Sequence, residues 1–145
     1  MQFVDLEPRA DGYWYDASRY REALPGFAEQ LPPGALAWAS DPAHYDFGST
    51  RCVKDLSLVR IDWQPTLVLH LGPNPWKHEH GLEIRYQGVM TFNVEVTQAA
   101  NAPPPSVQLD EVLPIEQGCQ HEVAFHGGRI TVIAADMEAR WHEDR

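Results

Sequence analysis

Positively charged side chains are scarce in this sequence, which holds 11 Lys and Arg against 21 Asp and Glu. The resulting formal net charge of −10 has the same sign as nucleic-acid phosphates and anionic lipid headgroups. Because like charges repel, we expect neither a nucleic acid nor a membrane surface as a partner. A basic protein partner is compatible with this charge.

Cysteine is also scarce, and long apolar runs are absent. Cys52 and Cys119 lie far apart and outside any CxxC spacing. A disulfide and two free thiols both stay open, and two thiols in a reducing cytosol fit this spacing better. No stretch approaches the ~20 apolar residues of a membrane-spanning helix. The first residues carry the acids Asp5 and Glu7 and lack the apolar core of a signal peptide. We therefore expect a cytoplasmic protein.

Motifs of nucleotide binding and of common hydrolases are missing as well. Gly127-Gly128 lacks the Lys-Ser/Thr that completes a P-loop and the third glycine of a dinucleotide fingerprint. There is no Gly-x-Ser-x-Gly elbow, no His-Glu-x-x-His pair and no calcium loop. We therefore expect a protein without enzymatic activity and without a cofactor.

What the sequence does contain is an alternation of apolar and polar residues that extends from Leu56 to Ala135. A period of two is typical of antiparallel strands with one buried face. The pattern predicts an α+β fold, predominantly antiparallel sheet, with about seven strands in meander order. We expect one domain over residues 1–145, in which residues 51–145 form the sheet and residues 1–50 form a cap.

The turns predict how the strands pair. Gly127-Gly128 is typical of a two-residue hairpin loop. Three-residue loops at 64–66 and 87–89 keep the apolar side chains on one face, whereas two-residue loops would not. The expected opposite pairs are Phe125 with Ile130, Ile61 with Leu69, and Ile84 with Phe92.

The first fifty residues predict a short helix within the cap. Asp16 is a good N-cap residue, and Ala17, Tyr20 and Leu24 share one helical face. Pro25-Gly26 is expected to end the helix. Four aromatic residues are expected to pack this cap against the sheet: Tyr13, Trp14, Tyr15 and Trp38.

His78-Glu79-His80 is the sharpest local cluster of potential metal ligands. In an extended segment, His78 and His80 point the same way and could share a metal ion. His70, from the preceding strand, could supply a third ligand. A metal-dependent or small-molecule enzyme around these histidines is one alternative function, and the other interpretation is a solvated start of a strand.

Two further pairs of residues are weaker candidates for chemistry. Cys119 and His121 sit at i and i+2 on one strand, the arrangement of a nucleophile beside a base. Because His121 falls on the expected core face, a buried and satisfied histidine is favoured. Asp110 and Glu111 are adjacent in a strand and therefore point to opposite faces, which argues against an acid–base pair.

Protein binding is the function that the composition favours. Trp76 stands in a loop between Pro75 and Lys77, and tryptophan is enriched in binding hot spots. Asp110, Glu111 and Glu116 are candidate acidic contacts to a basic partner. Trp63, in contrast, fits the core face. A homo-oligomer that uses an exposed sheet edge is the third hypothesis.

Three stretches carry a resemblance to known proteins: LEIRYQGVMTF (82–92), DEVL (110–113) and HEVAFHGGRITVIAADME (121–138). In hydrophobic pattern and turns they resemble a loosely defined group of small bacterial β-domains. Many of these are uncharacterised or are immunity proteins of polymorphic toxin systems. The resemblance covers under half of the chain and implies a non-enzymatic binding module, such as an immunity-type inhibitor. It transfers no site residue.

Overall fold

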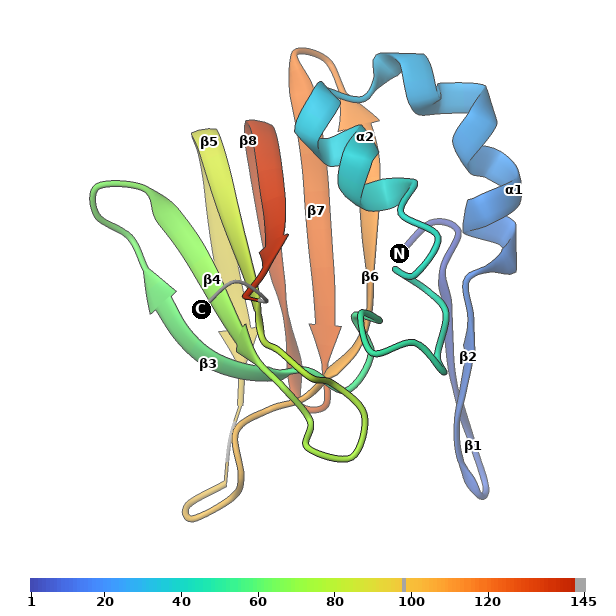
Figure 1. Ribbon diagram of the computed structural model, residues 1–145, viewed down its shortest axis with the longest axis vertical. Coiled ribbons are helices and arrows are strands. Elements are labelled where there is room, and N and C mark those ends of the chain that lie inside the picture. Colours follow the sequence, from blue (N-terminus) through green and yellow to red (C-terminus); the bar gives the residue numbers. More distant parts are fainter. Residues whose placement is uncertain (98, 143–145) are drawn as a thin grey trace.

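Two three-stranded units build the main sheet of the computed structural model, which describes residues 1–97 and 99–142 (Figure 1). In each unit, consecutive strands are neighbours, and β5 pairs with β8 to give the order β3-β4-β5-β8-β7-β6. The strands are β3 (Ser57–Asp62), β4 (Leu67–Gly72), β5 (Leu82–Val96), β6 (Val107–Ile115), β7 (Gly118–Phe125) and β8 (Gly128–Trp141). The predicted α+β class with a mainly antiparallel sheet is confirmed. The meander order holds only within each unit.

β5 is one long strand that bends at the position where a turn was expected. Gly88 has a φ of +61° beside a bulge, and the pairing of β5 with β8 shifts between Val89 and Thr91. A Cβ on Gly88 would lie 2.9 Å from the Cβ of Ala135, so glycine suits this corner in conformation and in space. The expected hairpin that pairs Ile84 with Phe92 is therefore wrong, because the chain bends there without reversing.

The two other expected registers had different outcomes. Ile61 does lie opposite Leu69. Between β7 and β8, Phe125 lies opposite Gly128, so its expected pairing with Ile130 is wrong by two residues. Gly127, with a φ of +100°, occupies the turn itself. Because side-chain direction repeats every two residues, this shift leaves the same side chains on the same face.

The two ends of the sheet approach each other. The N–H of Val107 donates to the carbonyl of Leu56 at 2.7 Å, and the N–H of Asp55 donates to the carbonyl of Val107 at 2.9 Å. Ser57 also forms an isolated bridge with Ser106. These contacts join the start of β3 to the start of β6, so the sheet wraps into a partly closed barrel.

The N-terminal fifty residues contain a hairpin that the sequence pattern did not predict. It consists of β1 (Asp5–Arg9) and β2 (Gly12–Asp16), and α1 (Ser18–Phe27), a 3₁₀ turn (Ala28–Gln30) and α2 (Pro33–Ala39) follow. The expected helix is present as α1, but it continues through Pro25, and Ala17 takes the N-cap position. Among the described residues, no helix is long and apolar enough to cross a membrane.

α2 packs against β8, and this contact places Trp38 in the core (Figure 1). The backbone N–H groups of Gly34 and Ala35 donate to the carboxylate of Asp136 at 3.2 and 3.0 Å. A Cβ on Gly34 would lie 1.8 Å from the carbonyl oxygen of Met137, so this close approach requires glycine. The sheet residues that form the buried core include Leu69, Ile84, Val112, Val123, Ile130 and Val132.

Candidate binding surface and the buried polar network

Asp110 is completely buried in the core, although the sequence pattern placed it on the wet face. A bulge in β6 between Val107 and Leu109 shifts the alternation, so Asp110 and Val112 turn inward together. The Asp110 carboxylate accepts hydrogen bonds from Trp38 Nε1 at 2.9 Å and His121 Nε2 at 2.7 Å. The prediction that Asp110 contacts a partner is therefore wrong.

A second histidine completes this network. His44 Nε2 lies 2.5 Å from Asp110 Oδ1, and His44 Nδ1 lies 2.9 Å from the carbonyl oxygen of Trp38. A carbonyl only accepts hydrogen bonds, so His44 Nδ1 donates to Trp38 and His44 Nε2 is the nitrogen paired with Asp110. Burial alone would raise the pKa of Asp110, but the charge of His44 and the bonds from both histidines hold it well below its usual range.

The other ring nitrogen of His121 faces a hydroxyl. Tyr86 Oη lies 2.6 Å from His121 Nδ1, while His121 Nε2 donates to the Asp110 carboxylate. Burial raises the pKa of Tyr86 well above its ordinary value, and the charge of Asp110 adds to this. Asp110, His44 and His121 are 0% exposed. The network therefore fixes the core and does not face a substrate.

The candidate nucleophile beside this network is a buried thiol. Cys119 and Cys52 are both buried free thiols. Burial and the nearby Asp136 raise the pKa of Cys119 to about 11, so its sulfur stays protonated near neutral pH. Both ring nitrogens of His121 are hydrogen-bonded, one to Tyr86 and one to Asp110. This confirms the interpretation of a buried and satisfied histidine.

Glu111 is also buried, and its carboxylate holds the beginning of the chain. It accepts the backbone N–H groups of Gln2, Phe3 and Val4 at 2.8, 2.7 and 2.9 Å. The prediction that Glu111 contacts a partner is wrong, because the chain itself occupies the carboxylate. Glu116 is exposed in the turn between β6 and β7, where its role stays a prediction.

Trp76 lies in the loop between β4 and β5 and is 95% exposed. This loop is held by internal hydrogen bonds. Asn74 accepts the N–H of Trp76 on its side-chain oxygen at 3.0 Å and the N–H of His78 on its carbonyl at 2.8 Å. Trp76 is therefore an exposed aromatic side chain on an ordered loop.

His78 fastens the same loop to the body of the protein. Its Nδ1 accepts the N–H of Asn74 at 3.0 Å, and its Nε2 donates to the carbonyl of Cys52 at 2.7 Å. Burial lowers the pKa of His78, which keeps the ring neutral. Because both nitrogens are used, the prediction of His78 as a metal ligand is wrong. His80 is half-buried and is not in the group that the structure assembles around His70.

Charged and aromatic side chains continue from the Trp76 loop across one end of the molecule. Figure 1 shows this loop, the β1–β2 turn and the β5–β6 segment all reaching the lower end of the view. Asp55 lies 3.2 Å from Lys77 and 3.0 Å from Lys54, whose ammonium stands 4.6 Å above the ring of Tyr15. Tyr15 stacks on Tyr13, whose ring meets His126 edge-on. We name this surface the loop-end patch: Tyr13, Tyr15, Lys54, Asp55, Trp76, Lys77 and His126.

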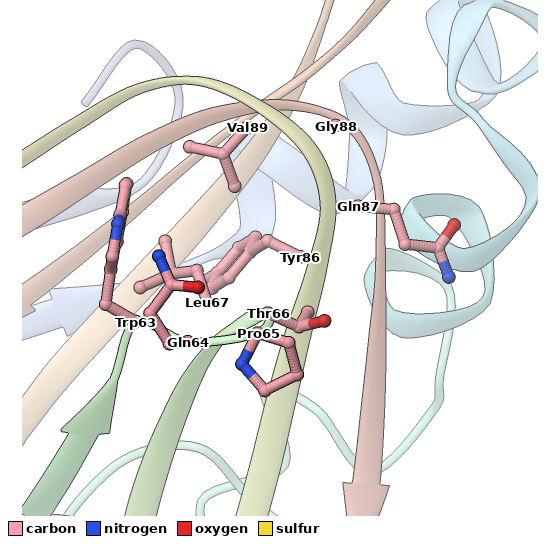
Figure 2. A pocket seen from close by; sticks show the side chains of 9 residues that line it. All are labelled: Trp63, Gln64, Pro65, Thr66, Leu67, Tyr86, Gln87, Gly88 and Val89. Atoms are coloured by element: carbon pink, nitrogen blue, oxygen red, sulfur yellow. The ribbon is translucent and has the colours of Figure 1, made fainter.

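Trp63 borders a separate hollow. It was expected on the core face, but it is 50% exposed and stacks on Phe92 with ring centroids 5.2 Å apart. Figure 2 shows Tyr86 and Leu67 between the β3–β4 turn and the bend of β5, where the hollow of about 280 Å³ lies. Tyr86 is only 2% exposed, so the hollow does not open onto the buried network.

His70 meets partners other than those that the sequence suggested. One donor atom from each of His70, Glu83 and His142 lies within 4.8 Å of the other two. Glu83 lies opposite His70 in the β4–β5 pairing, and the N–H of His142 donates to the carbonyl of Gly81 at 3.0 Å. Pairing of the strand that holds His70 with the next strand along the chain could have identified Glu83 as a neighbour of His70. His142 follows β8, which is far away in sequence.

Comparison with known proteins adds no relative. No family model matches the sequence, and no curated protein matches it.

Proposed function

We propose that this protein is a non-enzymatic protein-binding module whose loop-end patch contacts a basic protein partner. An immunity-type inhibitor of a toxin is the specific form of this proposal, and the sequence resemblance described above supports it. The observation that carries the proposal is the 95% exposure of Trp76 on a hydrogen-bonded loop.

An exposed tryptophan on an ordered loop suits a binding anchor. Binding hot spots are enriched in Trp and Tyr, because these side chains bury a large area and lose few rotamers. The loop-end patch offers Trp76 together with Tyr13, which is 49% exposed. Since His78 and Asn74 already hold the loop, little conformational entropy is lost when a partner docks.

Charge acts at longer range than the anchor. The two patch lysines are paired with Asp55, whose pKa their charges lower despite partial burial. The patch itself holds two lysines and one aspartate, whereas the whole chain carries −10. A field of that sign accelerates the encounter with a basic protein and weakens as salt is added.

The test uses the purified protein products of the neighbouring open reading frames as candidate partners. Their association with the full chain is measured by surface plasmon resonance over a salt series. Trp76→Ala is compared with Trp63→Ala, a matched control in which the removed tryptophan lies outside the loop-end patch. We expect Trp76→Ala to weaken binding about 30-fold or more, as for a hot-spot residue. Trp63→Ala should bind as the wild type does.

Three outcomes contradict the proposal. If Trp76→Ala bound the partner with the same affinity as the wild type, Trp76 would not be a binding anchor. An association rate that does not change with salt would argue against attraction to a basic partner. Sedimentation that shows a dimer of this chain, lost in Trp76→Ala, would assign the patch to a second copy of the protein.

A further inference from the structure

We propose that His70, Glu83 and His142 bind a divalent transition-metal ion, with Zn²⁺ as the ion to test. Donor atoms of the three residues already converge to within 4.8 Å of one another. Two imidazoles and one carboxylate form a ligand set that zinc and related ions accept. This site is distinct from the loop-end patch, and the inference does not rest on the proposed function.

Sheet pairing brings the three ligands together. His70 and Glu83 are direct cross-strand partners in β4 and β5, so their side chains leave the same face of the sheet. The end of β8 pairs with the start of β5, with Trp141 opposite Leu82, and His142 follows immediately. Three different strands thus hold the donors, and their spacing depends on the fold.

The ring of His70 is oriented by a carboxylate on its far side. His70 Nε2 lies 2.8 Å from Asp62 Oδ2, while His70 Nδ1 lies 3.8 Å from Glu83 Oε1. Donation of the Nε2 proton to Asp62 leaves a lone pair on Nδ1, on the side of Glu83. Metal-binding histidines usually have such a carboxylate on the second nitrogen.

The gap between His70 and Glu83 suits a bridging ion better than a direct contact. A separation of 3.8 Å is too long for a hydrogen bond. Two ligands at about 2.0–2.1 Å from one tetrahedral ion lie roughly 3.3 Å apart, so only a small contraction is needed. Glu83 also binds Arg85 at 3.1 Å, and a carboxylate has enough lone pairs to serve both.

The site has room for a further ligand. His70 and His142 line a hollow of about 430 Å³, together with Arg60 and backbone near Gly72 and Gly81. Three protein ligands leave at least one coordination position for water or a small anion, as in open zinc sites. Arg60, whose guanidinium lies 3.3 Å from His70 Nε2, adds a positive charge to the lining of this hollow.

The test is isothermal titration of the full chain with Zn²⁺, repeated with Co²⁺ and read by its visible absorption. We expect one ion per chain and a Co²⁺ spectrum typical of low-symmetry coordination. His70→Ala, Glu83→Gln and His142→Ala should each weaken Zn²⁺ binding about 100-fold or more, since loss of an outer partner alone costs 10–100-fold. Asp62→Asn should weaken it about 10-fold.

His80→Ala is the matched control, because it removes a nearby imidazole outside the group and should leave affinity unchanged. Circular dichroism checks that each variant is folded. If His70→Ala does not fold, the Zn²⁺ affinities of Glu83→Gln and His142→Ala test the proposed site. The inference is overturned if the wild type binds no Zn²⁺ at micromolar concentration. It is also overturned if folded His142→Ala and Glu83→Gln bind like the wild type, or if His80→Ala removes the ion.

Discussion

The molecule contains two groups of histidine and carboxylate with the same chemistry and opposite surroundings. In the first, Asp110 sits between His44 and His121 with none of the three exposed. In the second, His70 lies between Asp62 and Glu83 beside a hollow, with 18% of its side chain exposed. The first is closed by hydrogen bonds of 2.5–2.9 Å, and the second keeps a gap of 3.8 Å.

This difference shows how burial and saturation of partners separate structural groups from candidate binding groups. Asp110 has no lone pair directed at solvent, so its histidines can only hold the core together. Glu83 and His70 retain geometry that an added ion would complete. Residue type alone does not distinguish the two groups, because each combines histidine and carboxylate side chains.

The largest contrast is expected when each group loses its carboxylate charge. Asp110→Asn breaks the fully buried pair of Asp110 with His44, so it should cost about 3–5 kcal/mol of unfolding free energy. Glu83 is buried, but its partner Arg85 is half exposed, so Glu83→Gln should cost less than Asp110→Asn does. Urea denaturation of both variants measures this, and similar costs would break the comparison.

A smaller effect is expected from the hydroxyl at the edge of the buried network. Tyr86→Phe removes the hydrogen-bond partner of His121 Nδ1 and leaves that nitrogen buried and unpaired, which should cost about 1–3 kcal/mol. Asp62→Asn removes the corresponding partner of His70 at a partly exposed site, and we expect less than about 1 kcal/mol. If both variants lost the same unfolding free energy in urea denaturation, another group would have to hydrogen-bond His121 Nδ1 in Tyr86→Phe.

Acid should sharpen the comparison further. The pKa of Asp110 is lowered in the folded state, whereas an unfolded Asp titrates near ~3.9. Its stabilisation is therefore complete above that pH and is lost as the pH falls from there toward the folded pKa. In that window this residue should contribute a slope of up to about 1.4 kcal/mol per pH unit. Urea denaturation between pH 5 and 2.5 should show a shallower decline for Asp110→Asn than for Glu83→Gln, and parallel declines would contradict the lowered pKa.

The sequence predicted the sheet well because alternation survives local errors of pairing. The β7–β8 register was displaced by two residues, yet Val123 and Ile130 still faced the core. Bulges are different, because one extra residue reverses the alternation and leaves no mark in a hydrophobic pattern. The bulge in β6 turned Asp110 inward, and the bend at Gly88 replaced an expected hairpin.

The candidate sites were harder to predict because they depend on long-range contacts. His142 reaches His70 only through the pairing of β8 with β5, which requires the strand order. His78 was wrongly predicted as a metal ligand because its partner is the backbone carbonyl of Cys52. Side-chain motifs do not predict a contact with a distant backbone group. Trp76 was identified correctly as an exposed loop residue, because its Pro-rich flanks are local.

The smallest expected effect on stability belongs to Trp76, and it separates binding from folding most cleanly. Because Trp76 is 95% exposed, Trp76→Ala should change the unfolding free energy by no more than about 0.5 kcal/mol. His78→Ala, two residues away, removes one buried and one partly buried hydrogen bond and should destabilise the protein by about 1–3 kcal/mol. Urea denaturation compares the two variants. A loss for Trp76→Ala as large as that for His78→Ala would mean that the indole packs against the protein in solution, so the side chain would not be free to anchor a partner.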